Sequence, residues 1–320
     1  MRLVFAGSPA AAVPSLHTLA ESEHEVVGVL TRDDTPQGRK RVLTPTPVAS
    51  AADELGIPVI KTRRITDEVT AEISALEPDL GVIVAYGALL REPLLSTPRL
   101  GWINLHFSLL PRWRGAAPVQ RALIAGDEIT GAAVFQLVPE LDAGVVYGTI
   151  PRELGGDETA GDLLRELSRT GALLLEQVVD DLAAGIAVGV AQEGEVTLAP
   201  KLTLDDGLLD FALPASTLHD RYRGVSPEPG AFTSVGGGRL KVLEARLADL
   251  ASSAMPAGRI VLDGRRVLVG TATSPLELLV VQPAGKKPMA AADWLRGVSD
   301  REGLTVDAAV QVAPSDGSHA

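Results

Sequence analysis

The chain has 320 residues, a length that suits two domains, each with its own hydrophobic core. Its 46% hydrophobic and 22% charged residues are typical of a globular protein, and the absence of cysteine excludes disulfides, thiol nucleophiles and cysteine-ligated metal sites. The net charge of −12 argues against indiscriminate nucleic-acid binding but leaves room for a local basic surface. Without a leader-like N-terminus or a run of 18 apolar residues, we expect a cytoplasmic protein that does not bind membranes.

Strands and helices alternate in the predicted order of the first domain. Apolar runs predict strands at residues 3–6, 26–31, 58–60, 80–85, 130–138 and 145–150. Helices are predicted at residues 46–55, 66–76, 116–125 and 158–182, with Ser8, Thr46 and Thr66 as N-caps. This order predicts a doubly wound, mostly parallel, Rossmann-like α/β sheet whose ligands lie beyond the strand ends. The glycines of the dinucleotide-binding fingerprint are absent, so a nicotinamide or flavin site is not expected.

Glycine and proline punctuate the second half of the chain. They predict that a catalytic domain of residues 1–185 is followed by a linker of residues 186–205. Short β-branched runs between regularly spaced turns then predict a small antiparallel β-barrel, OB-like in size, over residues 206–310. Residues 311–320 have the composition of a disordered tail, and residues 32–45 that of a long polar loop.

The most informative stretch of the sequence is residues 101–120. Asn104 and His106 are two residues apart in a predicted strand, so their side chains share one face about 6.6 Å apart. The amide and the imidazole are therefore delivered to a loop that Pro111 turns, which is the usual layout of an α/β active site. Taken alone, such an asparagine and histidine are more often structural groups than catalytic ones.

A second polar element is the turn that contains Asp142. Asp142 lies two residues before Gly144, and aspartate is common in such turns. Without any family resemblance, a turn-forming role for Asp142 is therefore favoured over a catalytic one. A carboxylate beside an imidazole would nevertheless orient that imidazole and raise its pKa.

Residues 104–115 closely resemble the N-x-H-x-S-L-L-P-x-x-R-G signature of the 10-formyltetrahydrofolate-dependent formyltransferase family, and residues 141–144 resemble its D-x-G turn. The resemblance implies that Asn104, His106 and Asp142 are catalytic. It also implies a folate site made by Ser108, Leu109, Leu110, Pro111, Tyr86 and Gly87. The formyl donor would be 10-formyltetrahydrofolate, and no metal is expected.

Further motifs narrow the resemblance to the methionyl-tRNA formyltransferase family. They lie at residues 5–9, 36–47, 114–121, 199–202, 229–232 and 281–289. The resemblance implies a transferase whose acceptor is the α-amine of methionyl initiator tRNA. We expect the protein to be a monomer. It implies that Arg39, Lys40 and Arg41 contact the tRNA acceptor end, where cationic side chains would neutralise phosphates. Further contacts to the acceptor stem would come from the second domain, through Arg221, Arg223, Arg239 and Lys241.

Two departures from the family pattern and three alternatives accompany this interpretation. The basic loop lacks the usual glycine after Arg39, and Glu228 replaces an aromatic residue in a turn of the second domain. The alternatives are a formyltransferase acting on a small amine such as glycinamide ribonucleotide or an amino-sugar nucleotide, a hydrolase that releases formate, and a tRNA-binding protein without catalytic activity. The first two need neither the basic loop nor the second domain, and the third does not need the catalytic trio.

Overall fold

The computed structural model describes residues 1–38, 41–249 and 255–307, which fall into two units. Unit 1 comprises Met1–Arg121, Glu128–Gly155 and Asp162–Lys201, and unit 2 comprises Ala122–Asp127, Gly156–Gly161 and the described residues from Leu202 onward. Residues 186–201 of the predicted linker therefore lie in unit 1. The predicted tail, residues 311–320, lies outside the described residues. Within the described ranges, no helix combines the length and apolar character that a membrane crossing requires.

A seven-stranded sheet forms the centre of unit 1, in the order β10-β9-β7-β6-β1-β2-β5. Its strands are β1 (Arg2–Gly7), β2 (Glu25–Thr31), β5 (Val59–Lys61), β6 (Leu80–Val84), β7 (Trp102–His106), β9 (Ile129–Gln136) and β10 (Val146–Glu153). The ladders from β7 through β5 are parallel, whereas β9 pairs antiparallel with both β7 and β10. The predicted mostly parallel sheet is therefore confirmed.

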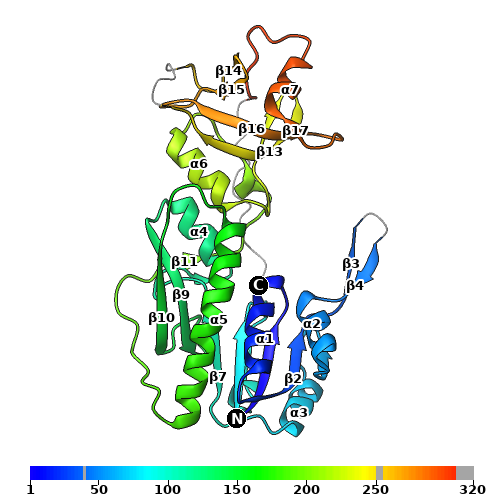
Figure 1. Cartoon of the computed structure of the whole chain (residues 1–320), viewed down its shortest axis with the longest axis vertical. Coiled ribbons are helices and arrows are strands. Elements are labelled where there is room, and N and C mark those ends of the chain that lie inside the picture. The colour runs from blue at the N-terminus through cyan, green and yellow to red at the C-terminus, as the bar shows by residue number, and fades with distance from the viewer. Residues whose placement is uncertain (39–40, 250–254, 308–320) are drawn as a thin grey trace. The chain divides into compact units, whose positions relative to one another are not determined.

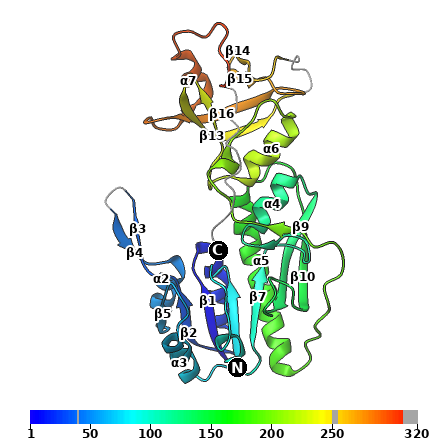
Figure 2. The same ribbon diagram turned by 180° about the vertical axis from the view of Figure 1, so that it is seen from behind.

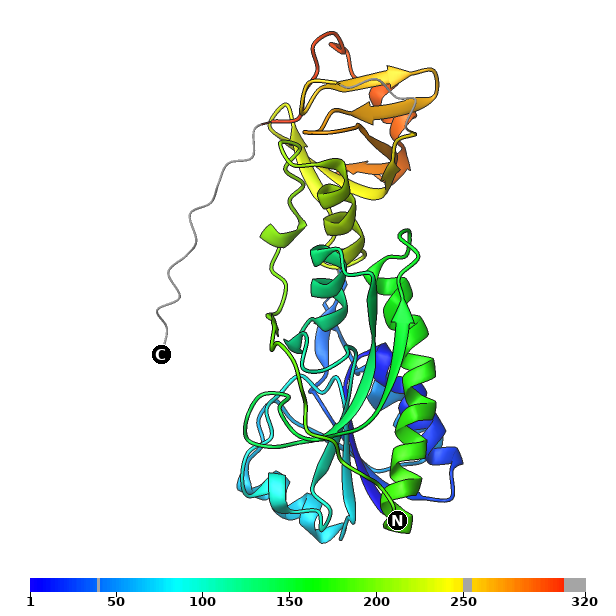
Figure 3. The same ribbon diagram turned by 90° about the vertical axis from the view of Figure 1, so that its left-hand side faces the viewer.

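Helices cover both faces of this sheet. The helices up to residue 184 are η1 (Ala10–Ala12), α1 (Val13–Glu21), α2 (Pro47–Leu55), α3 (Asp67–Ala75), η2 (Leu94–Ser96), α4 (Pro118–Ala125) and α5 (Ala160–Ala184). In Figure 1, α1 and α5 lie in front of the sheet, and from behind, in Figure 2, β1 and β7 lie in front of α5. Figure 3 shows α5 running along one side of the sheet.

Local signals in the sequence account for where two of these helices begin. Thr46 and Thr66 accept hydrogen bonds from the backbone N–H groups of Ala49 and Val69 and so cap α2 and α3, as predicted. The prediction for Ser8 is wrong: its hydroxyl donates to the carbonyl of Tyr86. Ser8 thus joins the carboxyl ends of β1 and β6 instead of beginning a helix.

Residues 32–45, predicted as a loop, contain a short hairpin. Its strands are β3 (Thr35–Gln37) and β4 (Val42–Thr44), which pair antiparallel. Gly38 and Arg41 adopt the left-handed conformation, with φ of 66° and 48°, so the chain reverses within a few residues. Sequence patterning did not reveal the hairpin because most of its side chains are exposed, so no buried face imposes an alternation.

Unit 2 contains an antiparallel sheet in the order β12-β13-β16-β15-β14, with β17 paired to β16. Its elements are η3 (Asp205–Gly207), α6 (Ala215–Gly224), β12 (Phe232–Val235), β13 (Gly238–Leu247), β14 (Ile260–Asp263), β15 (Arg266–Val269), β16 (Leu276–Pro283), β17 (Met289–Ala290) and α7 (Ala291–Arg296). The predicted antiparallel architecture is confirmed. Residues 304–307 bridge the two edge strands of this sheet: Ile260 of β14 donates to the carbonyl of Leu304, and Asp307 donates to the carbonyl of Ser234 in β12.

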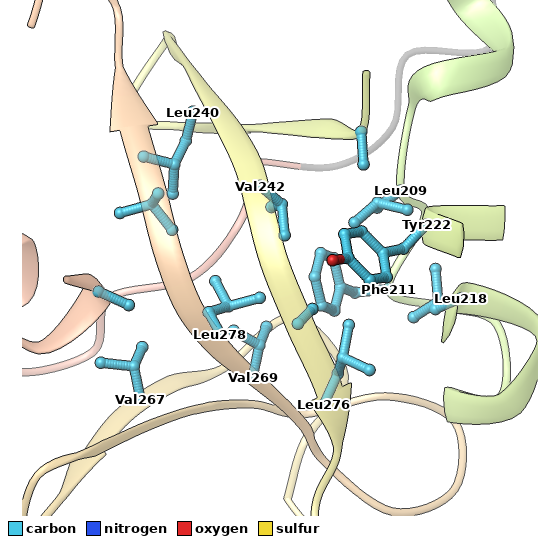
Figure 4. Close-up of a cluster of buried hydrophobic side chains, with 14 of the residues drawn as sticks. Leu209, Phe211, Leu218, Tyr222, Leu240, Val242, Val267, Val269, Leu276 and Leu278 are labelled. Carbon is cyan, nitrogen blue, oxygen red and sulfur yellow. The ribbon is translucent and has the colours of Figure 1, made fainter. Parts of the chain in front are cut away.

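Apolar side chains from α6 and from the sheet form the core of unit 2. Figure 4 shows Tyr222 and Leu218 of α6 facing Val242 of β13. Of the four basic residues predicted to contact an acceptor stem, Arg239 and Lys241 are exposed, and the Arg239 guanidinium lies 3.6 Å from the centre of the Phe232 ring. Arg223 is buried and paired with Asp220, and Arg221 donates to the carbonyl of Asp206. Arg223 therefore does not present its charge on the surface.

Candidate active site

Strand β7 carries Asn104 and His106 on the same face of the sheet. Its register sets Asn104 beside Ile83 of β6 and Phe135 of β9, so both neighbours of the strand restrain it. His106 is 5% exposed, and its ring meets that of Phe135 edge to face at 6.2 Å between centroids. The burial of an imidazole at a strand end, among apolar rings, marks a group that the fold holds in one orientation.

The hydrogen bond of His106 determines which ring nitrogen carries a proton. Its Nε2 lies 2.9 Å from the carbonyl oxygen of Trp113, and a carbonyl can only accept, so Nε2 is the protonated nitrogen. In the neutral ring, Nδ1 is then left with a free lone pair. Burial lowers the pKa of His106 below its ordinary value of 6.5, and the Asp142 charge and the Trp113 carbonyl oppose that shift. His106 is therefore a neutral ring with Nδ1 available as a base.

Asp142 lies on the Nδ1 side of this imidazole. Its Oδ2 is 3.8 Å from His106 Nδ1, and the same oxygen accepts the backbone N–H of Gly115 at 2.7 Å. The longer distance exceeds that of a hydrogen bond, so Asp142 acts on the ring mainly through its charge. With its side chain 11% exposed, that charge is poorly screened by solvent.

The backbone around Asp142 forms a tight turn in which two positions restrict the residue type. Asp142 has a left-handed φ of 46°, which aspartate tolerates better than most residues. A Cβ at Gly144 would lie 1.8 Å from the carbonyl oxygen of Gln136, so only glycine fits there. The D-x-G pattern noted in the sequence thus has a steric cause in the third residue and a conformational one in the first.

Asn104, His106 and Asp142 all line one cavity of about 700 Å³ in unit 1. This volume lies within the range of small-molecule sites. The other lining residues are Ile83, Ala85, Tyr86, Gly87, Ala88, Leu89, Leu105, Phe107, Arg114, Gly115, Ala116, Pro118, Leu141, Leu198, Ala199 and Pro200. Asn104 Oδ1 is buried without a hydrogen-bond partner among the described residues, as expected of a group that awaits a ligand.

The residues predicted to bind folate fall into two groups. Tyr86 and Gly87 line the cavity, whereas Ser108, Leu109, Leu110 and Pro111 are outside its described lining. The Ser108 hydroxyl donates to the carbonyl of Arg112 at 2.6 Å and so closes its own loop. Leu109 packs against Gly131 of β9, where a Cβ would lie 2.8 Å from its Cδ2. A direct contact between Ser108–Pro111 and a ligand stays a prediction.

Sequence reasoning missed the contribution of the predicted linker to the cavity. Strand β11 (Leu198–Ala199) pairs in parallel with β8 (Arg114–Gly115), and the carbonyl of Ala199 accepts two backbone N–H groups from Ala116 and Ala117. Leu198, Ala199 and Pro200 therefore form part of the wall. The short run Val196–Thr197–Leu198 was a possible signal, but two-residue pairings are too short for periodicity to reveal.

The basic segment predicted to bind tRNA is only partly visible. Arg41 is exposed at the turn between β3 and β4, and Arg39 and Lys40 lie outside the described residues. Two further basic residues in this region are paired with carboxylates, Lys61 with Asp34 at 2.8 Å and Arg63 with Asp33 at 3.3 Å.

Comparison with family models identifies the chain. A formyl transferase model matches residues 1–179, and a model of the formyl transferase C-terminal domain matches residues 201–299. The chain belongs to the formyl transferase family. Two relatives named methionyl-tRNA formyltransferase match the chain over nearly their whole length. The protein of Leifsonia xyli subsp. xyli is 59% identical, and the match covers 93% of this chain and 97% of the relative. The protein of Clavibacter michiganensis subsp. michiganensis is 58% identical, and the match covers 94% of this chain and 99% of the relative. The resemblance to the methionyl-tRNA formyltransferase family is thereby confirmed.

Two solved structures share the fold at low sequence identity. The sugar 3N-formyl transferase WlaRD superposes with a TM-score of 0.68 at 13% identity, over 90% of this chain and 99% of its own. HypX from Aquifex aeolicus, solved in complex with tetrahydrofolic acid, superposes with a TM-score of 0.62 at 15% identity, over 92% and 46%.

Proposed function

We propose that the chain transfers the formyl group of 10-formyltetrahydrofolate to the α-amine of methionyl initiator tRNA, giving N-formylmethionyl-tRNA. The observation that carries the chemistry is the convergence of Asn104, His106 and Asp142 on one cavity, with a neutral imidazole whose free Nδ1 faces a carboxylate. The choice of acceptor is supported by the relatives named methionyl-tRNA formyltransferase, which cover 93% of the chain or more. Because charged initiator tRNA is used in translation initiation, we place the reaction in the cytoplasm.

The reaction needs a neutral amine, stabilisation of an oxyanion and a path for one proton. As the amine nitrogen bonds to the formyl carbon, the Asn104 amide donates an N–H to the oxygen that becomes negative, which requires no change of protonation. His106 Nδ1 takes the proton that the amine loses, and Asp142 stabilises the resulting imidazolium. When the bond between the formyl carbon and the folate nitrogen breaks, His106 returns the proton to that nitrogen.

The cavity suits a folate derivative as the formyl donor. Most of its lining side chains are apolar, with the polar groups concentrated at Asn104, His106, Asp142 and Arg114. An apolar wall with few polar groups matches a planar pterin that carries hydrogen-bonding edges. The unpartnered Asn104 Oδ1 offers an acceptor within this lining. Tyr86 and Gly87 would form part of the donor site.

The basic hairpin supports a tRNA acceptor. Arg41 is exposed in a turn between two short strands, next to Arg39 and Lys40 in the sequence. We propose that these three side chains neutralise phosphates at the acceptor end of the tRNA, so that sequence-independent attraction brings the methionyl group to the cavity. A formyltransferase for a small amine has no use for such a segment.

The experiment that tests this function is formyl transfer from 10-formyltetrahydrofolate with methionyl initiator tRNA, uncharged tRNA or water as acceptor. We expect product with the charged tRNA alone, and a loss of about 100-fold or more in Asn104→Ala, as for removal of one oxyanion donor. Gln177→Ala, on the exposed surface of α5, is the control and should retain activity.

Two results would contradict the proposal. Consumption of the donor at the same rate with water as acceptor would identify a hydrolase. Formylation of an amino-sugar nucleotide or of glycinamide ribonucleotide in preference to charged tRNA would identify a small-amine transferase instead.

A further inference from the structure

Gln192 joins the turn that contains Asp142 to the Arg114–Gly115 strand. Its Nε2 donates to the backbone carbonyls of Asp142 and Gly144, at 2.8 and 2.9 Å. Its Oε1 accepts from Nε and Nη2 of Arg114, at 3.1 and 2.7 Å. The two N–H groups and the two lone pairs of the amide are therefore all used, so the side chain has one orientation.

These four contacts require an amide. The carbonyls of Asp142 and Gly144 need a donor, and the Arg114 guanidinium needs an acceptor, so neither a carboxylate nor an ammonium satisfies both sides. A glutamate would set a negative charge against two carbonyl oxygens. A methionine would fill a similar volume and leave all four groups unpaired.

The segment around Gln192 is itself held on both sides. Val190 and Val146 exchange both backbone hydrogen bonds, at 2.8 and 2.9 Å. Thr197 accepts from the backbone of Trp113 through its hydroxyl and from that of Arg114 through its carbonyl, each at 2.9 Å. Gln192 thus extends from a fixed backbone, and its contacts transmit that position to the turn of Asp142.

The turn has reason to need this support. Asp142 adopts a left-handed φ of 46°, a conformation that is unfavourable for residues other than glycine. Its carboxylate must nevertheless stay near His106, because the 3.8 Å separation exceeds hydrogen-bond range and the effect of the charge falls with distance. Two hydrogen bonds from Gln192 to the carbonyls on either side of Ala143 keep the backbone of this turn in place.

We infer that Gln192 is a positioning residue: it holds the Asp142 turn against the Arg114–Gly115 strand so that the carboxylate faces the His106 imidazole. Gln192 is outside the described lining of the cavity and acts through Asp142. The kinetic effects expected of Gln192 rest on the proposed function. The position of the Asp142 carboxylate beside His106 does not.

The test combines kinetics with an NMR titration of His106 in the full-length chain. Gln192→Met should lower kcat about 10-fold to 100-fold and leave both KM values within about threefold, since only chemistry uses the orientation of Asp142. Its His106 resonances should titrate at lower pH than in the wild type, because a more distant carboxylate stabilises the imidazolium less. Gln192→Glu should lower kcat similarly, because a carboxylate cannot donate to the carbonyls of Asp142 and Gly144. Gln177→Met, on the exposed face of α5, should change neither kcat nor the His106 titration.

A double-mutant comparison separates positioning from general stabilisation. If Gln192 acts through Asp142, the double variant Gln192→Met, Asp142→Asn should have a kcat less than twofold below that of Asp142→Asn alone. An additive loss, or a loss of kcat with an unchanged His106 titration, would overturn the inference. An altered titration in a protein that does not formylate charged tRNA would leave the positioning role intact and reject the proposed function.

Discussion

The Oδ2 atom of Asp142 accepts the backbone N–H of Gly115 at 2.7 Å, and the same atom lies 3.8 Å from His106 Nδ1. One carboxylate oxygen therefore has two functions: the short contact fixes its position, and the longer one stabilises charge on the ring. Since Gly115 belongs to the R-G part of the signature and Asp142 to the D-x-G turn, this hydrogen bond joins two motifs that are 27 residues apart. The arrangement of the proposed catalytic groups depends on this hydrogen bond.

Asp142→Asn should separate the charge of this residue from its shape. The amide keeps an oxygen for the Gly115 N–H but loses the charge that favours the imidazolium. We expect kcat to fall about 10²-fold to 10⁴-fold, as for loss of general acid–base catalysis, with little change in thermal stability. Kinetics with methionyl initiator tRNA and a thermal melt would measure both, and Asp67→Asn, exposed at the start of α3, is the control. A variant with near-normal kcat would exclude a role for the carboxylate charge.

The pH dependence of activity should reflect the burial of His106. Because burial lowers its pKa from 6.5, the ring stays neutral to lower pH than a free histidine. The His106 component of the acidic limb is therefore expected below pH 6.5, apart from that of the substrate α-amine, which loses its proton near pH ~8. It should move further down in Asp142→Asn. An NMR titration of the His106 ring from pH 5 to 8.5 measures this component separately from the amine. A ring that titrates above the ordinary histidine range would contradict the neutral-ring assignment.

The same group should make stability depend on pH. A histidine whose pKa is lower in the folded state binds fewer protons there than in the unfolded state. The contribution of His106 to the free energy of unfolding is therefore complete above pH 6.5 and is lost as the pH falls below 6.5. Urea unfolding at pH 8 and pH 5.5 should show a smaller decrease of the free energy of unfolding in His106→Gln than in the wild type. His17→Gln, a partly exposed position on α1, is the control and should behave like the wild type. Equal decreases in all three proteins would show that His106 does not titrate as proposed.

Gly144→Ala tests the steric reason for the D-x-G turn. The new Cβ would lie 1.8 Å from the Gln136 carbonyl oxygen, so the turn must move. Overpacking of this kind costs about 1–3 kcal/mol, and displacement of Asp142 should lower kcat at least about 10-fold. Gly238→Ala, whose Cβ would meet its nearest atom at an ordinary 3.5 Å, should have little effect on either. Chemical unfolding and kinetics measure the two effects, and a stable, active Gly144→Ala would refute the steric argument.

The basic hairpin should contribute electrostatically to tRNA binding. Arg41 is exposed, so Arg41→Ala should weaken binding to methionyl initiator tRNA. The slope of log K against the logarithm of the salt concentration should become shallower by about 0.9 for each phosphate contact that is lost. Lys61→Ala is the matched control, because Lys61 is already paired with Asp34 at 2.8 Å. Binding titrations at three salt concentrations measure the slopes, and the KM for the folate donor should be unchanged in both variants. Equal slopes for Arg41→Ala and the wild type would remove Arg41 from the interface.

Sequence alone determined the type of sheet, two helix caps and the presence of Asn104 and His106 on one face of a strand. These features depend only on residues close in the sequence: a buried strand needs an apolar run, a cap needs a side chain beside the helix start, and alternate residues of a strand share a face. The proposed catalytic role of Asp142 and the proposed folate-binding residues came from motif resemblance and not from local rules. The hairpin at residues 35–44 was not predicted because its exposed side chains impose no pattern.

Only the tertiary structure decided how the proposed catalytic groups are held. Gln192 is 50 residues from Asp142 and 78 from Arg114 in the sequence, and its contacts with them depend on a segment whose composition indicated a linker. The proton on His106 Nε2 follows from a carbonyl seven residues away, in a backbone turn that no periodicity describes. The sequence therefore determined which chemical groups are available at the strand end. Long-range hydrogen bonds, which exist only when distant segments meet in the folded chain, decided their orientation and protonation.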